Sequence, residues 1–354
     1  MSFKSIKLVL LLLPVYCFGQ EGKPISRKVF INYAVNQLTN VDYINQNFEL
    51  DFYLQQYWKI DSTDLSHQEI PGDSSENLAK IDSEHLNWVP KNDFTNAISI
   101  ESIGDINYSF EHGYVLQDAR YKGTFYNPMD MEQFPFDSQD LIIHLEDFSK
   151  TSEELEYLYG SPFEYYKIAS DTFLIPGGAA YEMGLDFSEF HLNPTAKAVF
   201  NKHLYKFDNQ TYSVSQFIMN ISRKRGFYFT KILFISLLIV LMSWIVFCMD
   251  PLDLHNRVSF SITAFLALTA HNFVINDLLP KISYLTTMDY IVLGTNLMVF
   301  FTVIESVVVA KVAFRKSEKA ANEIDRFCFL GCLAFFLSLC LFVYIKSLIN
   351  APVQ

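Results

Sequence analysis

Cysteine is scarce in this sequence of 354 residues, and the polar stretch from residue 20 to residue 222 contains none. That stretch therefore cannot form a disulfide or a cysteine-ligated metal site. One of the five cysteines lies in an apolar run near the N-terminus, and four lie in apolar runs of the last third of the chain. The five are Cys17, Cys248, Cys328, Cys332 and Cys340. Cys328 and Cys332, four residues apart in the last apolar run, are expected to be buried and unreactive thiols.

The sequence also lacks the short motifs that mark common active sites. It has no glycine-rich phosphate loop, no HExxH zinc-binding pair and no G-x-S-x-G nucleophile turn. The eight histidines are scattered, and each is expected to be a surface or core residue rather than a metal ligand. We therefore predict that the protein is not an enzyme and that it needs no cofactor and no metal.

Basic residues are few in the polar stretch, where a nucleic-acid binder would need them. The whole chain has 27 Lys plus Arg against 39 Asp plus Glu. Between residues 20 and 222 there are 31 acidic and only 13 basic side chains. Without a basic footprint for phosphates, nucleic acid is excluded as a partner. An acidic surface of this kind instead concentrates cations.

The first 19 residues have the composition of an export signal. Lys4 and Lys7 precede an apolar core, and Cys17 and Gly19 lie at positions suited to cleavage. This pattern predicts a secretory signal peptide over residues 1–19, which is too short to count as a membrane span. The domain that follows is therefore expected on the outer side of the membrane.

Residues 20–222 are expected to fold as a β sandwich. Short runs of alternating apolar and polar residues are separated by Asn, Asp, Gly and Pro, as in consecutive strands. Many strands at this spacing favour an all-β sandwich domain. The clearest runs are Phe48–Asp61, residues 112–128, residues 136–148 and a hairpin pattern over residues 199–222 that turns near Asp208.

The last third of the chain contains four apolar runs, each long enough to cross a membrane as a helix. They predict an all-α, four-helix transmembrane domain over residues 223–350. With the β domain outside, the connection between the third and fourth runs lies inside, and its excess of basic residues agrees with that orientation. Glu305, within the third run, is costly in lipid and should face a neighbouring helix or water. The runs cover residues 227–249, 258–279, 288–312 and 327–349.

The second run, Arg257–Pro280, is unusual because one of its faces is polar at both ends. Steps of four and three residues place six side chains on this face, with small hydroxyls first, an apolar middle and a carboxylate last. Such a face is costly in lipid but useful to a helix that lines water. The alternative is a packing helix whose small residues allow close contact. The face comprises Ser259, Thr263, Leu266, Ala270, Phe273 and Asp277.

The sequence Phe134-Pro135-Phe136-Asp137 resembles the FPFD loop of the pentameric ligand-gated ion channels, the Cys-loop receptor superfamily. The two cysteines that close this loop in animal receptors would fall at Asn127 and Leu141, so here the loop has no disulfide, as in bacterial members. One departure is Ile235-Ser236, where many members have a proline in the first span. Other motifs of the family follow in order along the mature chain: Trp58 with Asp61, Trp88-Val89-Pro90, Arg223-Lys224 with Tyr228, Met242-Ser243-Trp244, Asp250-Pro251, Leu279-Pro280, and Tyr284-Leu285-Thr286 with Asp289.

The resemblance implies a β sandwich above a four-helix bundle, with five identical subunits around a central pore. It also implies a multi-pass protein of the bacterial inner (plasma) membrane, with the N-terminal domain on the periplasmic or extracellular side. The short connection at residues 313–326 leaves no room for a large intracellular domain. The expected partners are four other copies of the chain, the lipid bilayer, permeant monovalent cations and a small extracellular agonist.

In the pore, the resemblance implies that Leu266 forms the central hydrophobic gate and that Asp277 forms an outer ring of five carboxylates. Carboxylate rings focus a negative potential on the axis, so we predict cation selectivity. Arg257 would favour anions if it pointed into the lumen, although the family usually turns a basic residue at this position away from the pore. The candidates for the inner mouth are Asp253, His255 and Asn256.

The resemblance also implies that the two domains are coupled where they meet. Asp137 near Arg223 would form a partly buried ion pair, with Asp42 as a further carboxylate. Truncating one partner of a buried pair can cost several kcal/mol, enough to shift a two-state gate. An ordinary structural salt bridge is the alternative, and both can hold. The other residues expected at this junction are Phe134, Pro135, Phe136, Pro280 and Lys281.

For the agonist, the resemblance implies a group of aromatic residues between subunits of the β domain. Aromatic rings can hold an organic ammonium through cation–π contacts of about 0.5–2 kcal/mol each. The alternative is that these residues belong to the core, since the chain has 33 Phe and 20 Tyr. Glu146 and Asp147 would favour a cationic ligand, or act as a proton sensor if desolvated. The candidates are Tyr53, Phe94, Phe148, Tyr205, Phe207 and Tyr212.

The sequence thus predicts a cation-selective, ligand-gated ion channel that is opened by an extracellular agonist such as an amine. Two alternatives remain open. One is a proton-gated cation channel of the same fold, and the other is a membrane-anchored ligand sensor that conducts nothing. A pure sensor would not need the aligned polar face of the second run.

Overall fold

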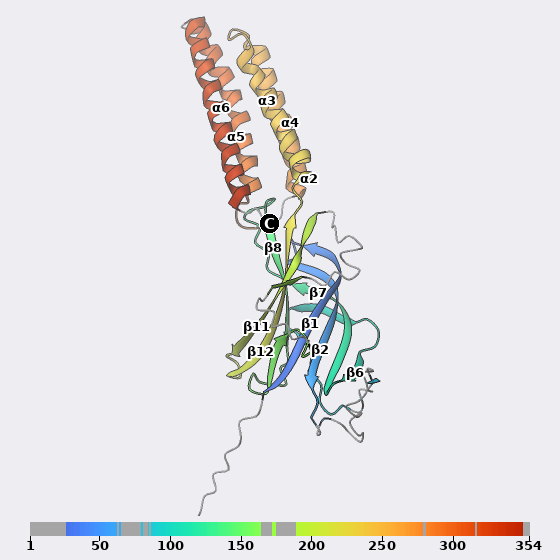
Figure 1. The fold of residues 1–354 in the computed structure, drawn as a ribbon. Helices are drawn as coiled ribbons and strands as arrows, with labels where there is room; N and C mark the ends of the chain where they lie inside the picture. The colour runs from blue at the N-terminus through green and yellow to red at the C-terminus, as the bar shows by residue number, and fades with distance from the viewer. Residues whose placement is uncertain are drawn as a thin grey trace, which may run out of the picture.

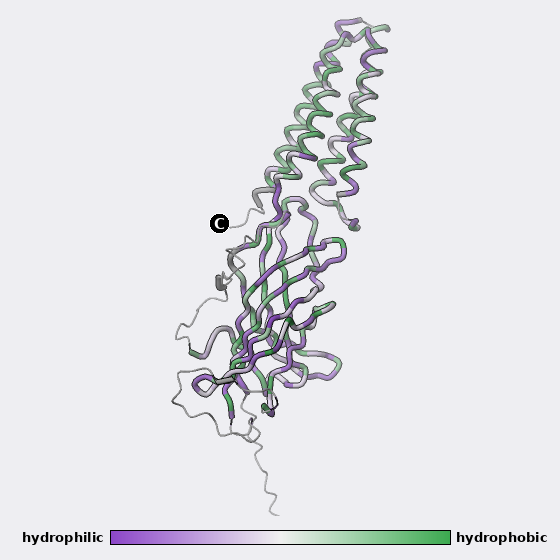
Figure 2. Tube along the Cα trace, turned by 90° about the vertical axis from the view of Figure 1, so that its right-hand side faces the viewer, coloured by the Kyte–Doolittle hydropathy of each residue, from purple (hydrophilic) through white to green (hydrophobic). Residues whose placement is uncertain are grey.

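The computed structural model consists of a β domain followed by a bundle of long helices, which stands on one end of that domain (Figure 1). Figure 2 shows the difference in composition, because hydrophobic residues dominate the helices whereas the two kinds alternate along the strands. The predicted signal peptide, residues 1–19, lies outside the described residues. The structure describes residues 26–61, 64, 79–80, 84, 86–163, 172–174, 189–278, 281–315 and 317–349.

Two β sheets make up the first domain, as the sequence predicted. One sheet has the strand order β3-β6-β7-β2-β1-β9, with β5 paired along β7, and the other has the order β10-β11-β12-β8-β4. The first sheet contains β1 (Arg27–Asp42), β2 (Asn47–Lys59), β3 (Ala79–Lys80), β5 (Ala97–Ser102), β6 (Asn107–Glu111), β7 (Tyr114–Tyr126) and β9 (Leu155–Tyr159). The second contains β4 (Asp93–Phe94), β8 (Ser138–Glu146), β10 (Thr172–Leu174), β11 (Phe190–Tyr205) and β12 (Gln210–Arg223).

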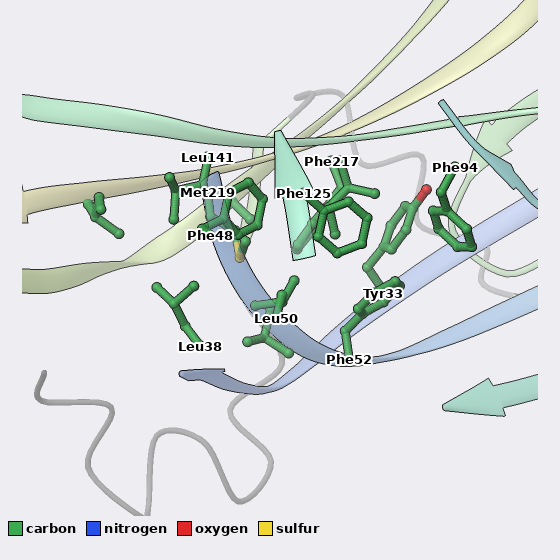
Figure 3. Packing of buried hydrophobic residues seen from close by; sticks show 14 of the residues in the cluster. Tyr33, Leu38, Phe48, Leu50, Phe52, Phe94, Phe125, Leu141, Phe217 and Met219 are labelled. Atoms are coloured by element: carbon green, nitrogen blue, oxygen red, sulfur yellow. The ribbon is translucent and has the colours of Figure 1, made fainter. Parts of the chain in front are cut away.

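The core of this domain lies between the two sheets because the long strands alternate in polarity. On β2, Phe48, Leu50 and Phe52 all point inward and are fully buried. Figure 3 shows inward side chains of both sheets packed together. The ring of Tyr33 on β1 stacks on that of Phe217 on β12, with centroids 4.6 Å apart, so this contact joins the sheets directly.

The long strands β11 and β12 form the predicted hairpin. Their register pairs Tyr205 with Gln210, and the chain reverses through the residues between them. Asn209 adopts a φ of 55° there, a left-handed conformation that asparagine tolerates. The side chain of Asp208 accepts the N–H of Gln210 (2.9 Å), which stabilises the turn. The hairpin tip therefore holds residues predicted for the agonist site in a fixed arrangement.

The helical domain contains four segments that are long and apolar enough to cross a membrane: Gly226–Cys248, Leu254–Asp277, Thr287–Arg315 and Glu318–Lys346. The first segment is continuous but changes type along its length. It comprises α2 (Gly226–Tyr228), the π-helix η2 (Phe229–Leu233), α3 (Phe234–Trp244) and the 3₁₀-helix η3 (Ile245–Cys248). The others are α4 (Leu254–Leu278), α5 (Thr287–Arg315) and α6 (Glu318–Ile349).

The connection between the third and fourth spans differs from the expectation. Residues 313–326 were expected as a loop, but α5 continues to Arg315 and α6 begins at Glu318. The sequence after Ser317 is rich in strong helix formers such as Ala320 and Ala321, which extend a helix beyond its apolar part. The side chain of Ser317 accepts the N–H of Ala320 (3.2 Å) and caps the new helix start. Basic residues predicted for a loop therefore lie on helical turns.

Candidate functional site

Helix α4 carries the predicted polar face on the side turned away from its own bundle. All six residues of that face, from Ser259 to Asp277, are exposed in the single chain, with Leu266 62% and Phe273 69% exposed. The hydroxyl of Thr263 donates to the carbonyl oxygen of Ser259 (2.8 Å). The opposite face packs against the other helices and comprises Arg257, Ser261, Ala264, Leu268, His271 and Ile275, all buried.

Arg257 lies on the buried face of α4 and does not belong to the exposed polar face. Its Nη2 contacts both carboxylate oxygens of Glu305 on α5 (3.0 and 3.2 Å), and its Nη1 contacts Asp325 on α6 (2.8 Å). Glu305 thus faces a neighbouring helix, as the sequence predicted. Sequence reasoning missed Asp325, although an acidic residue just before an apolar run was a signal that could have identified it. One guanidinium therefore joins three helices.

The residues predicted for the inner mouth lie at the start of α4. Asp253 accepts the N–H of Asn256 (3.2 Å) and its side-chain amide (2.6 Å), as a residue that caps a helix N-terminus does. His255 is exposed. The structure thus brings the three candidates into one helical turn, with the carboxylate of Asp253 tied to its own helix.

The first span contacts α4 through an irregular turn. The π-helix η2 lies just before Ile235-Ser236, the position at which many family members have a proline. His271 Nε2 on α4 lies 3.3 Å from the carbonyl oxygen of Ile232 within this turn, a hydrogen bond that the Nε2–H tautomer donates. Isolated π turns occur frequently at functional positions. The first span therefore has an irregular helical turn that contains no proline.

At the junction of the two domains, Arg223 and Asp137 form the predicted ion pair. Nε of Arg223 donates to Oδ1 of Asp137 (2.8 Å), and Nη2 donates to Oδ2 (3.2 Å). Both side chains are buried. The guanidinium also lies over the rings of Phe134 (4.7 Å) and Phe190 (4.5 Å). Arg223 ends β12 only a few residues before the first span. The pair therefore lies where a movement of the β domain would reach the membrane.

Asp42 has a different contact from the one expected. Instead of joining Arg223, its carboxylate accepts the N–H groups of Ile44 (2.9 Å) and Asn45 (3.0 Å) and the side-chain amide of Asn45 (2.7 Å). These hydrogen bonds, led by the backbone of Asn45, hold the pKa of Asp42 below its ordinary value. The second carboxylate near Arg223 is that of Glu189, at 3.8 Å. Asp42 therefore fixes the turn between β1 and β2.

The FPFD loop is bonded to the start of the third span. The N–H groups of Thr287 and Met288 donate to the carbonyl oxygens of Glu132 (2.9 Å) and Phe134 (3.1 Å). The hydroxyl of Tyr284 accepts the N–H of Met131 (2.9 Å). The loop thereby satisfies backbone donors that the first turn of a helix leaves unpaired.

The other junction candidates are divided between buried and exposed positions. Pro135 is buried after a cis peptide bond, and Phe136 packs edge-on against Phe229 of the first span (5.9 Å). Lys281 is exposed. Pro280 lies outside the described residues. Of this set, Phe136 and the neighbouring Phe134 contact the helical domain directly.

Three of the predicted agonist-site residues form one aromatic group on the second sheet. Phe148 follows β8, Tyr205 ends β11 and Tyr212 lies on β12. The ring centroid of Phe148 lies 5.4 Å from that of Tyr205 and 5.4 Å from that of Tyr212. The centroids of Tyr205 and Tyr212 are 5.8 Å apart, and the rings of each pair are nearly perpendicular. Phe207, at the exposed hairpin tip, lies 5.5 Å from Tyr205. We name Phe148, Tyr205, Phe207 and Tyr212 the aromatic box.

A buried carboxylate lies beside the aromatic box. The hydroxyl of Tyr205 donates to Glu146, with both carboxylate oxygens 2.9 Å away. Burial raises the pKa of the Glu146 carboxyl above its ordinary value, despite this hydrogen bond. His203, which sequence reasoning did not select, packs 4.4 Å from the ring of Tyr205. A second carboxylate, that of Asp208, accepts the hydroxyl of Tyr212 (2.7 Å). The arrangement combines aromatic faces with negative groups, which suits a cationic ligand.

The remaining two candidates lie elsewhere. Phe94 is a core residue, 9% exposed and 5.2 Å from Tyr121, so the structure contradicts its assignment to the box. Tyr53 lies on β2 of the first sheet and is 39% exposed. The guanidinium of Arg120 lies over its ring (5.6 Å) and is bonded to Asp51 (2.6 Å). Tyr53 therefore belongs to a separate surface of the same chain.

Comparison with known proteins covers both domains. The family model described as the neurotransmitter-gated ion-channel ligand binding domain matches residues 16–225, and the one for the neurotransmitter-gated ion-channel transmembrane region matches residues 233–338. The serotonin-gated chloride channel mod-1 of Caenorhabditis elegans is 26% identical over 292 residues, which cover 79% of this chain and 54% of that protein. The human gamma-aminobutyric acid receptor subunit rho-2 is 25% identical over 336 residues, which cover 89% and 64%. The chain thus spans between half and two thirds of the length of these relatives.

Proposed function

This chain belongs to the neurotransmitter-gated ion-channel family, and from that premise we propose that five copies form a cation-selective channel opened by an extracellular amine. The observation that carries the proposal is the exposed polar face of α4. Its residues face away from the bundle, where a single chain has nothing to cover them. Five such faces around an axis would line a continuous aqueous path with a ring of Leu266 at its narrow part, which can close by dewetting.

Cation selectivity is supported by the charges along α4. Asp277 places one exposed carboxylate per chain at the outer end, and the half-buried Asp253, bonded to Asn256, lies near the inner end. Arg257, the basic residue that argued for anions, is buried against Glu305 and Asp325. The alternative is anion selectivity, since mod-1 is named a chloride channel. Lys281 is exposed just beyond the outer end of α4 and also counts for that alternative.

Reversal potentials in a NaCl gradient test the selectivity. We expect the reversal potential to follow sodium. We also expect Asp277→Asn to lower single-channel conductance, most clearly at low salt, where the Debye length exceeds the ~8 Å of physiological solutions. Asp277→Lys should lower it further, and Lys281→Gln serves as the matched control for the opposite charge. A reversal potential that follows chloride would overturn the assignment.

An amine is the agonist class that the aromatic box fits best. Each aromatic face offers about 0.5–2 kcal/mol to an ammonium, and the Glu146 carboxylate adds a charge of the right sign. A panel of primary and quaternary amines, applied to the expressed chain, identifies the agonist. Tyr205→Phe keeps the ring but removes the hydrogen bond to Glu146, whereas Tyr205→Ala removes both. We expect the alanine variant to lose far more sensitivity than the phenylalanine variant.

A proton-gated channel is the second candidate, and Glu146 is the observation that favours it. Its buried carboxyl has a raised pKa, so it can bind a proton in moderately acidic solution. A step to acidic pH without any amine separates the two candidates. Current under that condition, abolished in Glu146→Gln, would make protons the agonist.

The chain is a multi-pass membrane protein with an extracellular N-terminal domain and four spans. We place it in the inner (plasma) membrane of a bacterium. The support is the unclosed FPFD loop, in which Asn127 and Leu141 replace cysteines, together with the short α5–α6 connection.

A further inference from the structure

We propose that the inner end of the helical domain binds the headgroup of an aminophospholipid, in a cavity between the first span and α6. The cavity has a volume of about 450 Å³. One wall is the end of the first span with the turn Met249–Pro251, and the other is α6 from Glu318 to Phe329. We name it the inner cavity.

The position of the inner cavity points to lipid as the occupant. The first span ends at Cys248 and the fourth begins at Glu318, so both walls lie at the inner ends of spans. This end of the bundle is the one farthest from the β domain (Figure 1). Because the β domain is extracellular, the inner cavity lies at the depth of the headgroups of the inner leaflet. The molecule that surrounds a membrane protein at this depth is a phospholipid.

The charges of the inner cavity select the kind of headgroup. Asp250 and Glu318 contribute exposed carboxylates, and Arg326 contributes an exposed guanidinium. Within the described part of the chain, the side chains of Glu318 and Arg326 make no hydrogen bond or ion pair. A primary ammonium matches the carboxylates, and a phosphate matches the guanidinium. Asp250 already accepts the N–H of Leu252 (2.9 Å), so Glu318 is the carboxylate that a headgroup without an ammonium would leave unpaired.

The apolar side of the inner cavity can accept the start of an acyl chain. Phe247 and Phe329 both line it, with ring centroids 5.6 Å apart. Trp244 packs against Phe329 at 5.9 Å, and its buried indole N–H has no partner among the described residues. The rings of Phe247 and Phe329 thus give an acyl chain an apolar wall beside the charged part of the cavity.

The occupant of this cavity would act on the pore-facing helix, because Arg257 holds both walls. Its Nη1 donates to the carbonyl oxygen of Met249 (3.1 Å) in one wall and to the carboxylate of Asp325 (2.8 Å) in the other. A headgroup that separates or draws together the walls therefore moves the base of α4. This consequence rests on the proposed channel function, whereas the binding itself does not.

Lipid retention by the full-length channel tests the proposal. The protein is reconstituted in vesicles of equal parts phosphatidylcholine, phosphatidylethanolamine and phosphatidylglycerol, re-extracted, and its bound lipids are measured by native mass spectrometry. We expect phosphatidylethanolamine to be enriched several-fold, and Glu318→Gln and Arg326→Gln each to remove most of that enrichment. Glu323→Gln and Lys319→Gln, on α6 but outside the inner cavity, are the matched controls and should retain it.

Three results would overturn the proposal. One is retention in the proportions of the vesicle, and another is enrichment of phosphatidylglycerol over phosphatidylethanolamine. The third is displacement of the bound lipid by soluble phosphoethanolamine as effectively as by phosphatidylethanolamine itself, which would show that the free headgroup suffices. The assay needs no current, so its failure is distinguishable from a failure of the proposed channel function.

Discussion

Arg223 is the residue through which the two domains share a buried charge. Its guanidinium is bonded to Asp137 and enclosed by aromatic rings, so neither member of the pair can exchange its partner for water. A buried pair gives little net stability compared with an apolar pair, but removing one partner leaves an uncompensated charge. The same arrangement that makes the pair a weak source of stability makes it sensitive to truncation.

We therefore expect Arg223→Gln to destabilise the protein by roughly 3–5 kcal/mol. The double variant Arg223→Gln/Asp137→Asn should be less destabilised than the sum of the single variants, because it removes both charges. Thermal denaturation of the purified protein measures both. Purely additive effects would show that the two groups do not interact as the structure places them.

Glu146 gives a pH dependence whose sign follows from its burial. Its pKa is raised because burial disfavours the ionised carboxylate. The neutral form adds stability below the ordinary pKa of a glutamate, and this contribution is lost as the pH rises through the raised value. Above that value the carboxylate is ionised beside His203, and an ammonium ligand would supply a full positive charge.

Apparent affinity for an amine should therefore weaken as the pH falls through the raised pKa of Glu146 towards the ordinary pKa of glutamate. In Glu146→Gln the affinity should be low and nearly independent of pH. Concentration–response curves at several pH values measure this, with the exposed Glu153→Gln as control. An unchanged pH profile in Glu146→Gln would exclude Glu146 from the site.

At the scale of the element, α4 divides its residues between two environments. Its exposed face carries Leu266, and its buried face is anchored to α5 and α6 by Arg257. Rotation of the helix about its axis is thus restricted by one guanidinium near its inner end. In the proposed channel, the orientation of the polar stripe towards the pore would depend on that contact.

Leu266→Ala should make the channel easier to open, because a smaller side chain widens the narrow ring and lets it wet more readily. We expect the half-maximal agonist concentration to fall roughly tenfold, which corresponds to about 1.4 kcal/mol. Ile262→Ala, an exposed position of α4 outside the stripe, is the control. If the two variants behave alike, the stripe does not line the pore.

Arg257→Gln should lower the melting temperature of the purified channel strongly, with a loss of roughly 3–5 kcal/mol, because Glu305 and Asp325 would lose their shared cation. Arg257→Lys should be intermediate, since an ammonium cannot bond two carboxylates with the geometry of a guanidinium. Glu305→Gln leaves the Asp325 contact in place and should be milder. Equal melting temperatures for wild type and Arg257→Gln would contradict the observed packing.

At the scale of the whole molecule, the exposed face of α4 indicates that several copies of the chain assemble with these faces towards one another. Exposing the polar side chains of such a face to lipid would cost free energy, so the face should be turned away from lipid. The closed arrangement that gives every copy the same environment is a symmetric ring. Within the family to which this chain belongs, that ring has five subunits.

The purified protein in detergent should accordingly have a mass about five times the 40.9 kDa of one chain. Light scattering with correction for bound detergent measures it. A stable monomer or dimer in several detergents would remove the channel proposal, because one α4 cannot enclose a pore.

The sequence by itself determined the two-domain architecture, the four spans and the polar stripe. These properties are local or motif-based: alternation of polarity defines strands, apolar length defines spans, and helical spacing defines a face. They hold whatever the neighbours of a given residue are. The connection after Arg315 is shorter than predicted, because helix-forming residues start α6 before its apolar run begins.

Only the tertiary structure decided which partner each special side chain has. Arg257 could face the lumen or the bundle until α5 and α6 were placed, because helical spacing fixes faces relative to one another but not to the rest of the molecule. Phe94 and Phe148 are both aromatic residues in irregular segments, yet one packs into the core and the other joins the aromatic box. Their environments depend on strands distant in sequence, β7 for Phe94 and the β11–β12 hairpin for Phe148, and packing between distant segments is a property that local pattern does not contain.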